Sequence, residues 1–175
     1  MGDSPQSTPV HSTTELPLTE RLAARLLSEG EKTAAFFQDL TPEQWNTPIY
    51  ETGSCWTIGQ ILSHFVSTEQ AFADLIANIL DNGPGAPENF DIDEYNERHV
   101  ARLEGVQVNE LLMQYLNNRG ENVRLVQAMR PRDLQRQGRH PFLGIVSLEE
   151  IVKLLYRHNQ IHLRDVRRAL NSPPE

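Results

Sequence analysis

The chain has 175 residues, a length that suits one domain with a substantial hydrophobic core. Its net charge is −8, with 3 basic and 16 acidic residues in 1–97 and 13 basic and 8 acidic residues in 98–175. Two halves of opposite charge pair laterally when they fold side by side, which argues against a DNA- or RNA-binding protein. Because the sequence has neither an apolar leader segment nor a run of 18 apolar residues, we expect a soluble, cytoplasmic protein without membrane contact.

The ends of the chain and its single cysteine limit the candidate sites further. Residues 1–14 are rich in Ser, Thr and Pro and are predicted to form a disordered tail, in which His11 has no role. Residues 172–175 form a short second tail, so one domain is expected over 15–171. Cys55, the single cysteine, excludes an internal disulfide and a cysteine-rich zinc site, and is expected to be a small buried filler.

A first helix is predicted over residues 18–40, where apolar residues recur at helical spacing along one face. A short extra turn follows it. Thr41 and Gln44 can form a capping box there, and Pro42 suits the first helical position. Residues 46–54, which contain Pro and Gly, are predicted to form a loop.

A second long helix is predicted to begin after Thr57, which can form another capping box with Gln60. Apolar residues mark one face of this helix as buried. His64 lies on that face, three residues beyond Ile61. A buried imidazole needs polar partners, so His64 is a candidate ligand for a metal ion.

The middle of the chain predicts two more helices and one apolar loop. Residues 81–87 (DNGPGAP) end the second helix, and a connection of about a dozen residues could span roughly 40 Å, enough to cross a whole bundle. Helices are expected over 93–103 and 108–129. Gly120 costs the second of these about 1 kcal/mol of helix propensity, which suggests a close helix crossing. The apolar run 140–146 is flanked by Pro and Gly and is predicted to be a tucked loop.

The last predicted helix, residues 147–170, starts with a capping box of Ser147 and Glu150. Its apolar face, which includes Ile161, carries His158 and His162 one turn apart, a spacing at which two rings can share one cation. Taken alone, this pair is equally compatible with one satisfied core histidine and one solvated histidine. The candidate ligand on the second helix favours a metal site. The whole pattern predicts an all-α fold, a four-helix bundle with short extra helical turns.

Five segments, in their order and spacing, resemble the DinB/YfiT-like superfamily of metalloenzymes over residues 16–170. That group includes thiol-dependent S-transferases and maleylpyruvate isomerases. The segments are LTPEQW (40–45), WTIGQILSH (56–64), YNE (95–97), HPFLG (140–144) and the helix segment 158–170.

The resemblance implies that His64, His158 and His162 bind one divalent ion inside the bundle. Some isomerase relatives carry glutamate at the first position of the last-helix pair, so His158 favours the broader DinB-like or S-transferase branch. Three neutral imidazoles suit Zn, Ni, Fe or Mn and leave coordination positions open. His99 and His140 lie off the predicted stripes and are expected to be structural or solvated.

No clear general base emerges beside these ligands. Glu69 follows His64 by five residues, about 140° round the helix, and is not expected to face the metal. Asp165, three residues after His162, is better placed to accept the free ring N–H of His162 and so to orient that ligand. An ion pair of Asp165 with a surface arginine such as Arg168 is the alternative.

Three functions remain open from the sequence. The first is a metal-dependent enzyme with a small-molecule substrate, a thiol-dependent S-transferase that uses a low-molecular-weight thiol, with a thiolate or hydroxide activated at the ion. The second is a metal-dependent hydrolase. The third, favoured by the lack of a convincing base, is a stress-associated metal-binding or dimerisation module without turnover. A homodimer is expected by analogy with the family.

Overall fold

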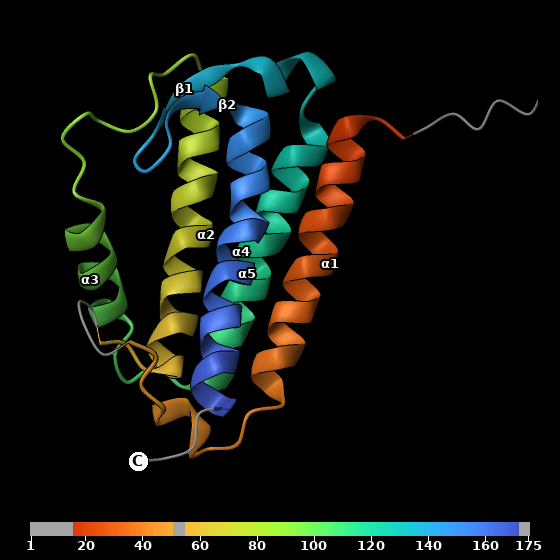
Figure 1. The fold of residues 1–175 in the computed structure, drawn as a ribbon. Helices are drawn as coiled ribbons and strands as arrows, with labels where there is room; N and C mark the ends of the chain where they lie inside the picture. Colours follow the sequence, from red (N-terminus) through yellow and green to blue (C-terminus); the bar gives the residue numbers. More distant parts are fainter. Residues whose placement is uncertain (1–15, 51–54, 172–175) are drawn as a thin grey trace, which may run out of the picture.

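The structure is a computed structural model that describes residues 16–50 and 55–171. The predicted all-α four-helix bundle with short extra helical turns is confirmed (Figure 1). The predicted tails, with His11, lie outside the described residues. The helices of the bundle are α1 (Leu18–Gln38), α2 (Ile58–Leu80), α4 (Val108–Ala128) and α5 (Leu148–Asn171). The remaining elements are α3 (Ile92–Arg102), the 3-10 turns η1 (Gln44–Asn46) and η2 (Pro131–Gln135), and the strands β1 (Gln137–His140) and β2 (Gly144–Ser147).

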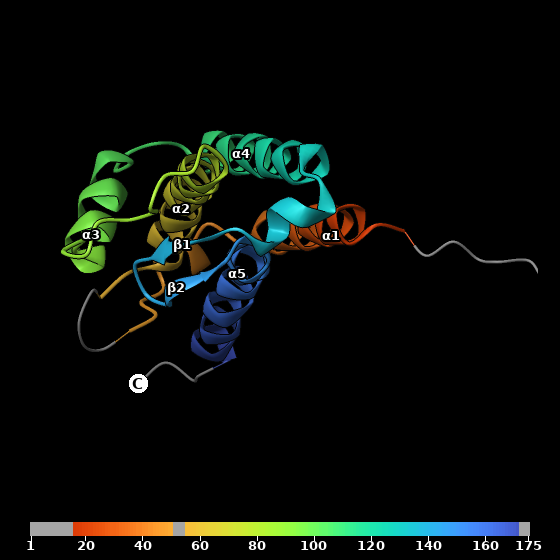
Figure 2. The same ribbon diagram turned by 90° about the horizontal axis from the view of Figure 1, so that it is seen from above.

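The helices are not arranged in sequence order around the bundle. Seen from above, the order is α1, α4, α2, α5 (Figure 2). The long connection after α2 makes this possible, because it carries the chain down α3, outside the bundle, before α4 rises next to α2. As a result, α4 packs against both α1 and α2, and α5 also contacts both α1 and α2.

The helix starts agree with the capping signals in the sequence. Thr57 and Gln60 form the predicted reciprocal capping box at the start of α2. Gln44 accepts a hydrogen bond from the backbone N–H of Thr41, and Ser147 accepts one from the N–H of Glu150. The caps at α2 and α5 fix where these two helices begin, and therefore which of their side chains face the bundle axis.

Two apolar clusters fill the bundle, and a layer of buried polar residues separates them. One cluster lies toward the hairpin end and the other toward the η1 end. The polar layer contains residues of all four bundle helices at the same level. The inward-facing side chains of each helix are therefore polar for about one turn. Its members include Thr33, Ser67, Thr68, Glu69, Arg119, Asn122 and Asn159.

The apolar run 140–146 is part of a hairpin, so the predicted loop is wrong. β1 and β2 pair antiparallel, with His140 opposite Gly144. The other edge of β1 is also paired, because the N–H of Arg139 donates to Pro84 O and Arg139 O accepts from the N–H of Ala86. Long-range backbone pairing of this kind leaves little trace in the local residue pattern.

Two further expectations of burial need correction. The fully buried face of α5 runs through Leu155, Asn159 and Leu163, whereas Ile161, predicted to be inward, is 49% exposed. The histidines of α5 therefore flank the buried stripe. Cys55 is exposed and is not a buried filler.

The close helix crossing occurs at Gly30 of α1 and not at Gly120. A Cβ atom on Gly30 would lie 2.7 Å from Cγ of the buried Arg119, whereas one on Gly120 would meet only the Arg124 guanidinium, at 3.6 Å.

Gly120→Ala is therefore expected to raise the free energy of unfolding by about 0.5–1 kcal/mol through helix propensity. Gly30→Ala is expected to lower it by about 1–3 kcal/mol through overpacking. Urea unfolding of both variants tests this, and equal stabilisation would contradict the crossing.

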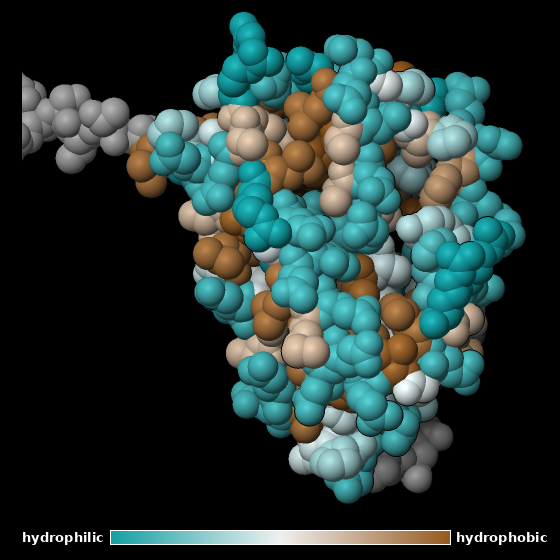
Figure 3. All heavy atoms as spheres, turned by 180° about the vertical axis from the view of Figure 1, so that it is seen from behind, coloured by the Kyte–Doolittle hydropathy of each residue, from teal (hydrophilic) through white to brown (hydrophobic). Residues whose placement is uncertain are grey.

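The outer surface shows no continuous apolar face in the view from behind. In Figure 3 the apolar residues over α1 and α4 are broken into patches by hydrophilic residues. Leu27, Met113 and Leu116 are the large exposed apolar residues on these two helices. No described helix is long and apolar enough to cross a membrane. The expected homodimer stays a prediction.

Candidate metal centre

Three imidazole rings from two helices converge inside the bundle. His64 comes from α2, and His158 and His162 come from α5. Nε2 of His158 lies 2.9 Å from Nε2 of His64 and 3.1 Å from Nε2 of His162. Among the described His, Cys, Asp and Glu residues, these three form the one cluster whose ligand atoms could share an ion. The structure thus brings together all three predicted ligands.

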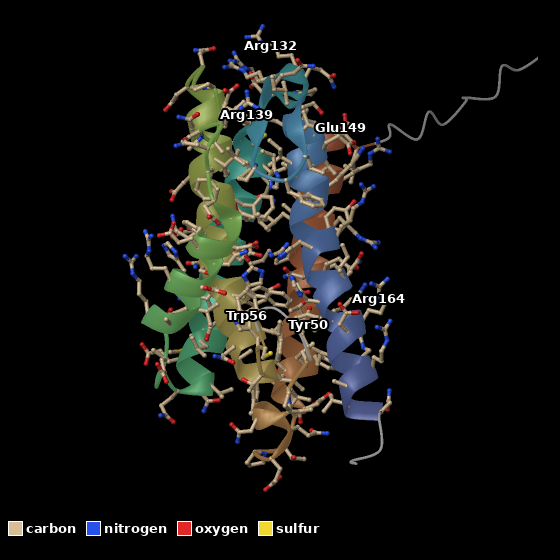
Figure 4. The ribbon with its side chains drawn as sticks, turned by 60° about the vertical axis from the view of Figure 1, so that its left-hand side comes forward. Tyr50, Trp56, Arg132, Arg139, Glu149 and Arg164 are labelled. Carbon is tan, nitrogen blue, oxygen red and sulfur yellow. The ribbon has the colours of Figure 1, made fainter. Side chains whose placement is uncertain are left out.

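Aromatic side chains surround this cluster. The ring of Trp56 lies 5.0 Å from that of His64, and the Phe65 ring lies 5.9 Å from His158 and 5.8 Å from His162. In Figure 4, Trp56 and Tyr50 lie between α2 and α5. Such a wall excludes water from one side of the cluster and strengthens electrostatic interactions within it.

The histidines are held in the neutral form that binds metal. Burial lowers the pKa of His158 to about 3 and that of His162 to about 4. Burial, followed by the proximity of the other two rings, holds the pKa of His64 well below its usual value. At pH 7 the three Nε2 atoms can therefore act as ligands without first losing a proton.

The spacing of the nitrogen atoms fits a single ion. Two histidine nitrogens that bind one tetrahedral ion at about 2.0–2.1 Å lie about 3.3 Å apart. The observed 2.9 and 3.1 Å are slightly shorter. One proton can bridge only one pair of the three Nε2 atoms. The lone pair of the remaining Nε2 then faces the other two without a hydrogen between them. A cation between the three rings removes that repulsion.

Comparison with known proteins identifies the family and the fold. The sequence model described as DinB superfamily matches residues 25–166, a span that contains all three histidines. The chain belongs to the DinB superfamily. A solved structure described as "YfiT from Bacillus subtilis is a probable metal-dependent hydrolase with an unusual four-helix bundle topology" has the same fold, with a TM-score of 0.70 at 18% identity. The match covers 94% of this chain and 91% of the YfiT chain. No curated protein matched.

Tyr50 takes the place beside His162 that was predicted for Asp165. Its hydroxyl lies 2.9 Å from Nδ1 of His162. The carboxylate of Asp165 hydrogen-bonds the Tyr50 hydroxyl, and its Oδ1 lies 3.8 Å from Nη1 of Arg168. Tyr50 therefore lies between Asp165 and the His162 ring. If Nε2 of His162 binds the ion, the ring proton sits on Nδ1 and is donated to the Tyr50 hydroxyl. Tyr50 lies in a predicted loop, where no periodic pattern marks it.

We expect Tyr50→Phe to weaken metal binding by about 10–100-fold, the usual effect of removing the hydrogen-bond partner of a metal ligand. Asp165→Asn keeps an acceptor for the Tyr50 hydroxyl and is expected to change the affinity less than Tyr50→Phe does. Competition titration with a chromophoric chelator measures both variants. A larger loss in Asp165→Asn would restore Asp165 as the direct partner of His162.

A polar network in this DinB-superfamily bundle starts beside the histidines. Asn159 Oδ1 lies 3.4 Å from Nδ1 of His158, and Asn159 Nδ2 donates to the hydroxyl of Tyr115 over 2.8 Å. That hydroxyl also accepts from Arg119, which donates to Glu69 over 2.5 Å. His158 is thus connected through buried hydrogen bonds to an ion pair in the polar layer.

Glu69 is buried and points into this network, not at the cluster, which agrees with its predicted position off the metal. Asn122 Nδ2 donates to its Oε2 over 2.9 Å. Burial raises the pKa of Glu69 to about 7, even though Arg119 and Asn122 both oppose that rise. The network that positions His158 therefore contains a carboxyl group that titrates near neutral pH.

Proposed function

We propose that this chain is a metal-dependent enzyme in which His64, His158 and His162 hold one divalent ion. The observation that carries the proposal is the convergence of three neutral Nε2 atoms at the spacing of a shared ion. A Zn, Ni, Fe or Mn ion there would supply Lewis-acid activation of a nucleophile at neutral pH. The protein positions the three rings and excludes water on their aromatic side.

Transfer of a low-molecular-weight thiol is the first candidate reaction. Within the described part of the chain, no carboxylate joins the three histidines. A free thiol has a pKa of about 8.5, and an ion held by the three histidines would lower that pKa further. The thiolate would therefore form at neutral pH without a carboxylate to take its proton. Hydrolysis is the second candidate, because the related fold of YfiT is described as that of a probable metal-dependent hydrolase.

The test uses purified protein loaded with each candidate ion. Cysteine, glutathione and coenzyme A are offered with 1-chloro-2,4-dinitrobenzene, and p-nitrophenyl acetate is offered without thiol. We expect metal-dependent thioether formation with release of chloride, abolished by EDTA and by His158→Ala. Ester hydrolysis alone would assign a hydrolase instead. Neither activity, with one ion bound, would assign a non-catalytic metal-binding module.

We also propose that the chain forms a homodimer. Light scattering of the metal-loaded protein measures it directly. A mass of about twice 19.9 kDa is expected, and a monomer mass would remove the dimer from the account.

A further inference from the structure

A second feature of the bundle is a cavity of about 310 Å³ beside α2. It lies between α2, α3, the connection that joins them and the turn of the hairpin. Small-molecule sites have volumes of about 300–1,000 Å³, so the cavity is large enough for a compact ligand. Its wall is mainly apolar and includes Phe72, Leu75, Phe90, Ile92, Tyr95 and Pro141.

His140 supplies a directed polar group in this wall. Nδ1 of His140 accepts hydrogen bonds from the backbone N–H groups of Phe142 (3.1 Å) and Leu143 (3.3 Å). Burial lowers the pKa of His140 to about 4, so the ring is neutral at pH 7 and its one proton sits on Nε2. The Phe72 ring, with its centroid 5.6 Å away, helps to fix the orientation.

The Nε2–H of His140 is available to a ligand. It has no hydrogen-bond partner among the residues that the structure describes, while Nδ1 has two. Nε2 of His140 is not among the buried side-chain atoms that lack a partner, so in a residue that lines the cavity it can donate to a water or a ligand. A carbonyl oxygen of a ligand would match this donor.

The charge of the lining restricts the ligand further. Asp74 is the one charged residue among the described lining residues. None of the described lining residues is Lys or Arg and His140 is neutral, so no positive charge there compensates an anion, and Asp74 repels one. An uncharged ligand fits the cavity best.

Thr68 and His140 place the cavity about one helical turn from the metal centre, toward the hairpin. Thr68 lines it, and the Thr68 hydroxyl donates to the backbone carbonyl of His64 over 2.8 Å. Along α2 these residues are four apart, a rise of about 6 Å. On the hairpin side, His140 is close enough to His158 to contribute to the lowering of the His158 pKa, of which burial is the main cause.

We propose that this cavity binds the apolar part of the substrate of the metal centre, an uncharged aryl or alkyl carbonyl compound whose carbonyl oxygen accepts a hydrogen bond from His140 Nε2–H. The assignment of the ligand as substrate rests on the proposed metal-dependent function. The cavity itself is tested without turnover and without metal.

Two fluorescent naphthalenes serve as ligands. Prodan is uncharged and carries a ketone, and N-phenyl-1-naphthylamine is uncharged and lacks a carbonyl. Ala71→Trp places a large ring in the cavity, and Ala77→Trp adds the same ring on an exposed position of α2 as the matched control. His140→Asn keeps an acceptor where Nδ1 stands and removes the Nε2–H donor. Circular dichroism confirms that each variant is folded.

Both dyes are expected to bind the wild type saturably at one site. Ala71→Trp is expected to weaken both by at least about 10-fold, with Ala77→Trp unchanged. His140→Asn is expected to weaken Prodan by about 5–10-fold, the effect of one hydrogen bond, and to leave N-phenyl-1-naphthylamine within about twofold. No saturable binding, or unchanged binding in Ala71→Trp, overturns the cavity as a site. Equal effects of His140→Asn on both dyes overturn the carbonyl contact.

The link to the metal centre has its own readout. In protein loaded with Co²⁺, saturating Prodan is expected to change the d–d absorption of the ion, and Ala71→Trp is expected to prevent that change. An unchanged spectrum with Prodan bound overturns the assignment as a substrate pocket. A protein that binds no Co²⁺ at the histidines but still binds Prodan refutes the metal centre and, with it, the substrate assignment, while the cavity stands as a ligand site.

Discussion

Glu69→Met is expected to lower the free energy of unfolding by about 3–5 kcal/mol, because it leaves the guanidinium of Arg119 buried without its partner. Arg119 is 1% exposed and donates to Glu69 over 2.5 Å. Its Nε and Nη1 groups already lack hydrogen-bond partners within the described structure, so without Glu69 the charge would keep only the neutral Tyr115 hydroxyl and ring beside it. Urea unfolding of the metal-free protein at pH 8 measures the loss, since the carboxyl is then above its pKa of about 7 and ionised.

The double variant Glu69→Met/Arg119→Met is the control for this prediction. Two apolar side chains of similar volume often replace a buried ion pair at no cost, or even with a gain. We therefore expect the double variant to recover most of the stability lost in either single variant. Additive losses in the double variant would show that the ion pair is a net source of stability and would contradict this account of the polar layer.

His158→Ala is expected to weaken metal binding by more than about 100-fold, beyond the range seen when only a ligand's hydrogen-bond partner is removed. His158 is the central ring of the cluster, since its Nε2 atom lies within 3.1 Å of both other Nε2 atoms. Two remaining imidazoles cannot hold the ion in the same geometry. Mass spectrometry of the metal content after dialysis, together with chelator competition, gives the affinity.

His99→Ala provides the matched control for this loss. His99 lies on α3 and stacks on Tyr95, with ring centroids 3.8 Å apart, away from the cluster. Its removal is expected to leave the metal content unchanged. Equal metal content in His158→Ala and His99→Ala would mean that the ion binds elsewhere or not at all.

Local rules in the sequence predicted which histidines face inward. The capping box at Thr57 sets the phase of α2, so His64 faces inward, and the i, i+4 spacing aligns His158 with His162. The bundle itself followed from the same helical periodicity. These helix faces depend on residues that are close together in the chain. That His64 meets His158 across 94 positions was implied by the family resemblance.

The features that were missed depend on contacts between distant segments. The partners of Glu69 come from α4, about 50 residues further on, and nothing in the periodicity of α4 marks Arg119 as buried. Tyr50 reaches His162 from a loop 112 positions away. The hairpin depends on the pairing of Arg139 with the connection near Gly85. Such contacts follow from tertiary packing, which local pattern does not encode.

Anomalous diffraction from crystals of the purified protein, measured at the absorption edges of the candidate metals, tests the three-histidine centre most directly. The account predicts one strong peak, at about 2.0–2.2 Å from Nε2 of His64, His158 and His162, and its loss in His158→Ala. Ordered histidines with no peak between them, in protein purified without chelators and supplied with metal, would contradict it.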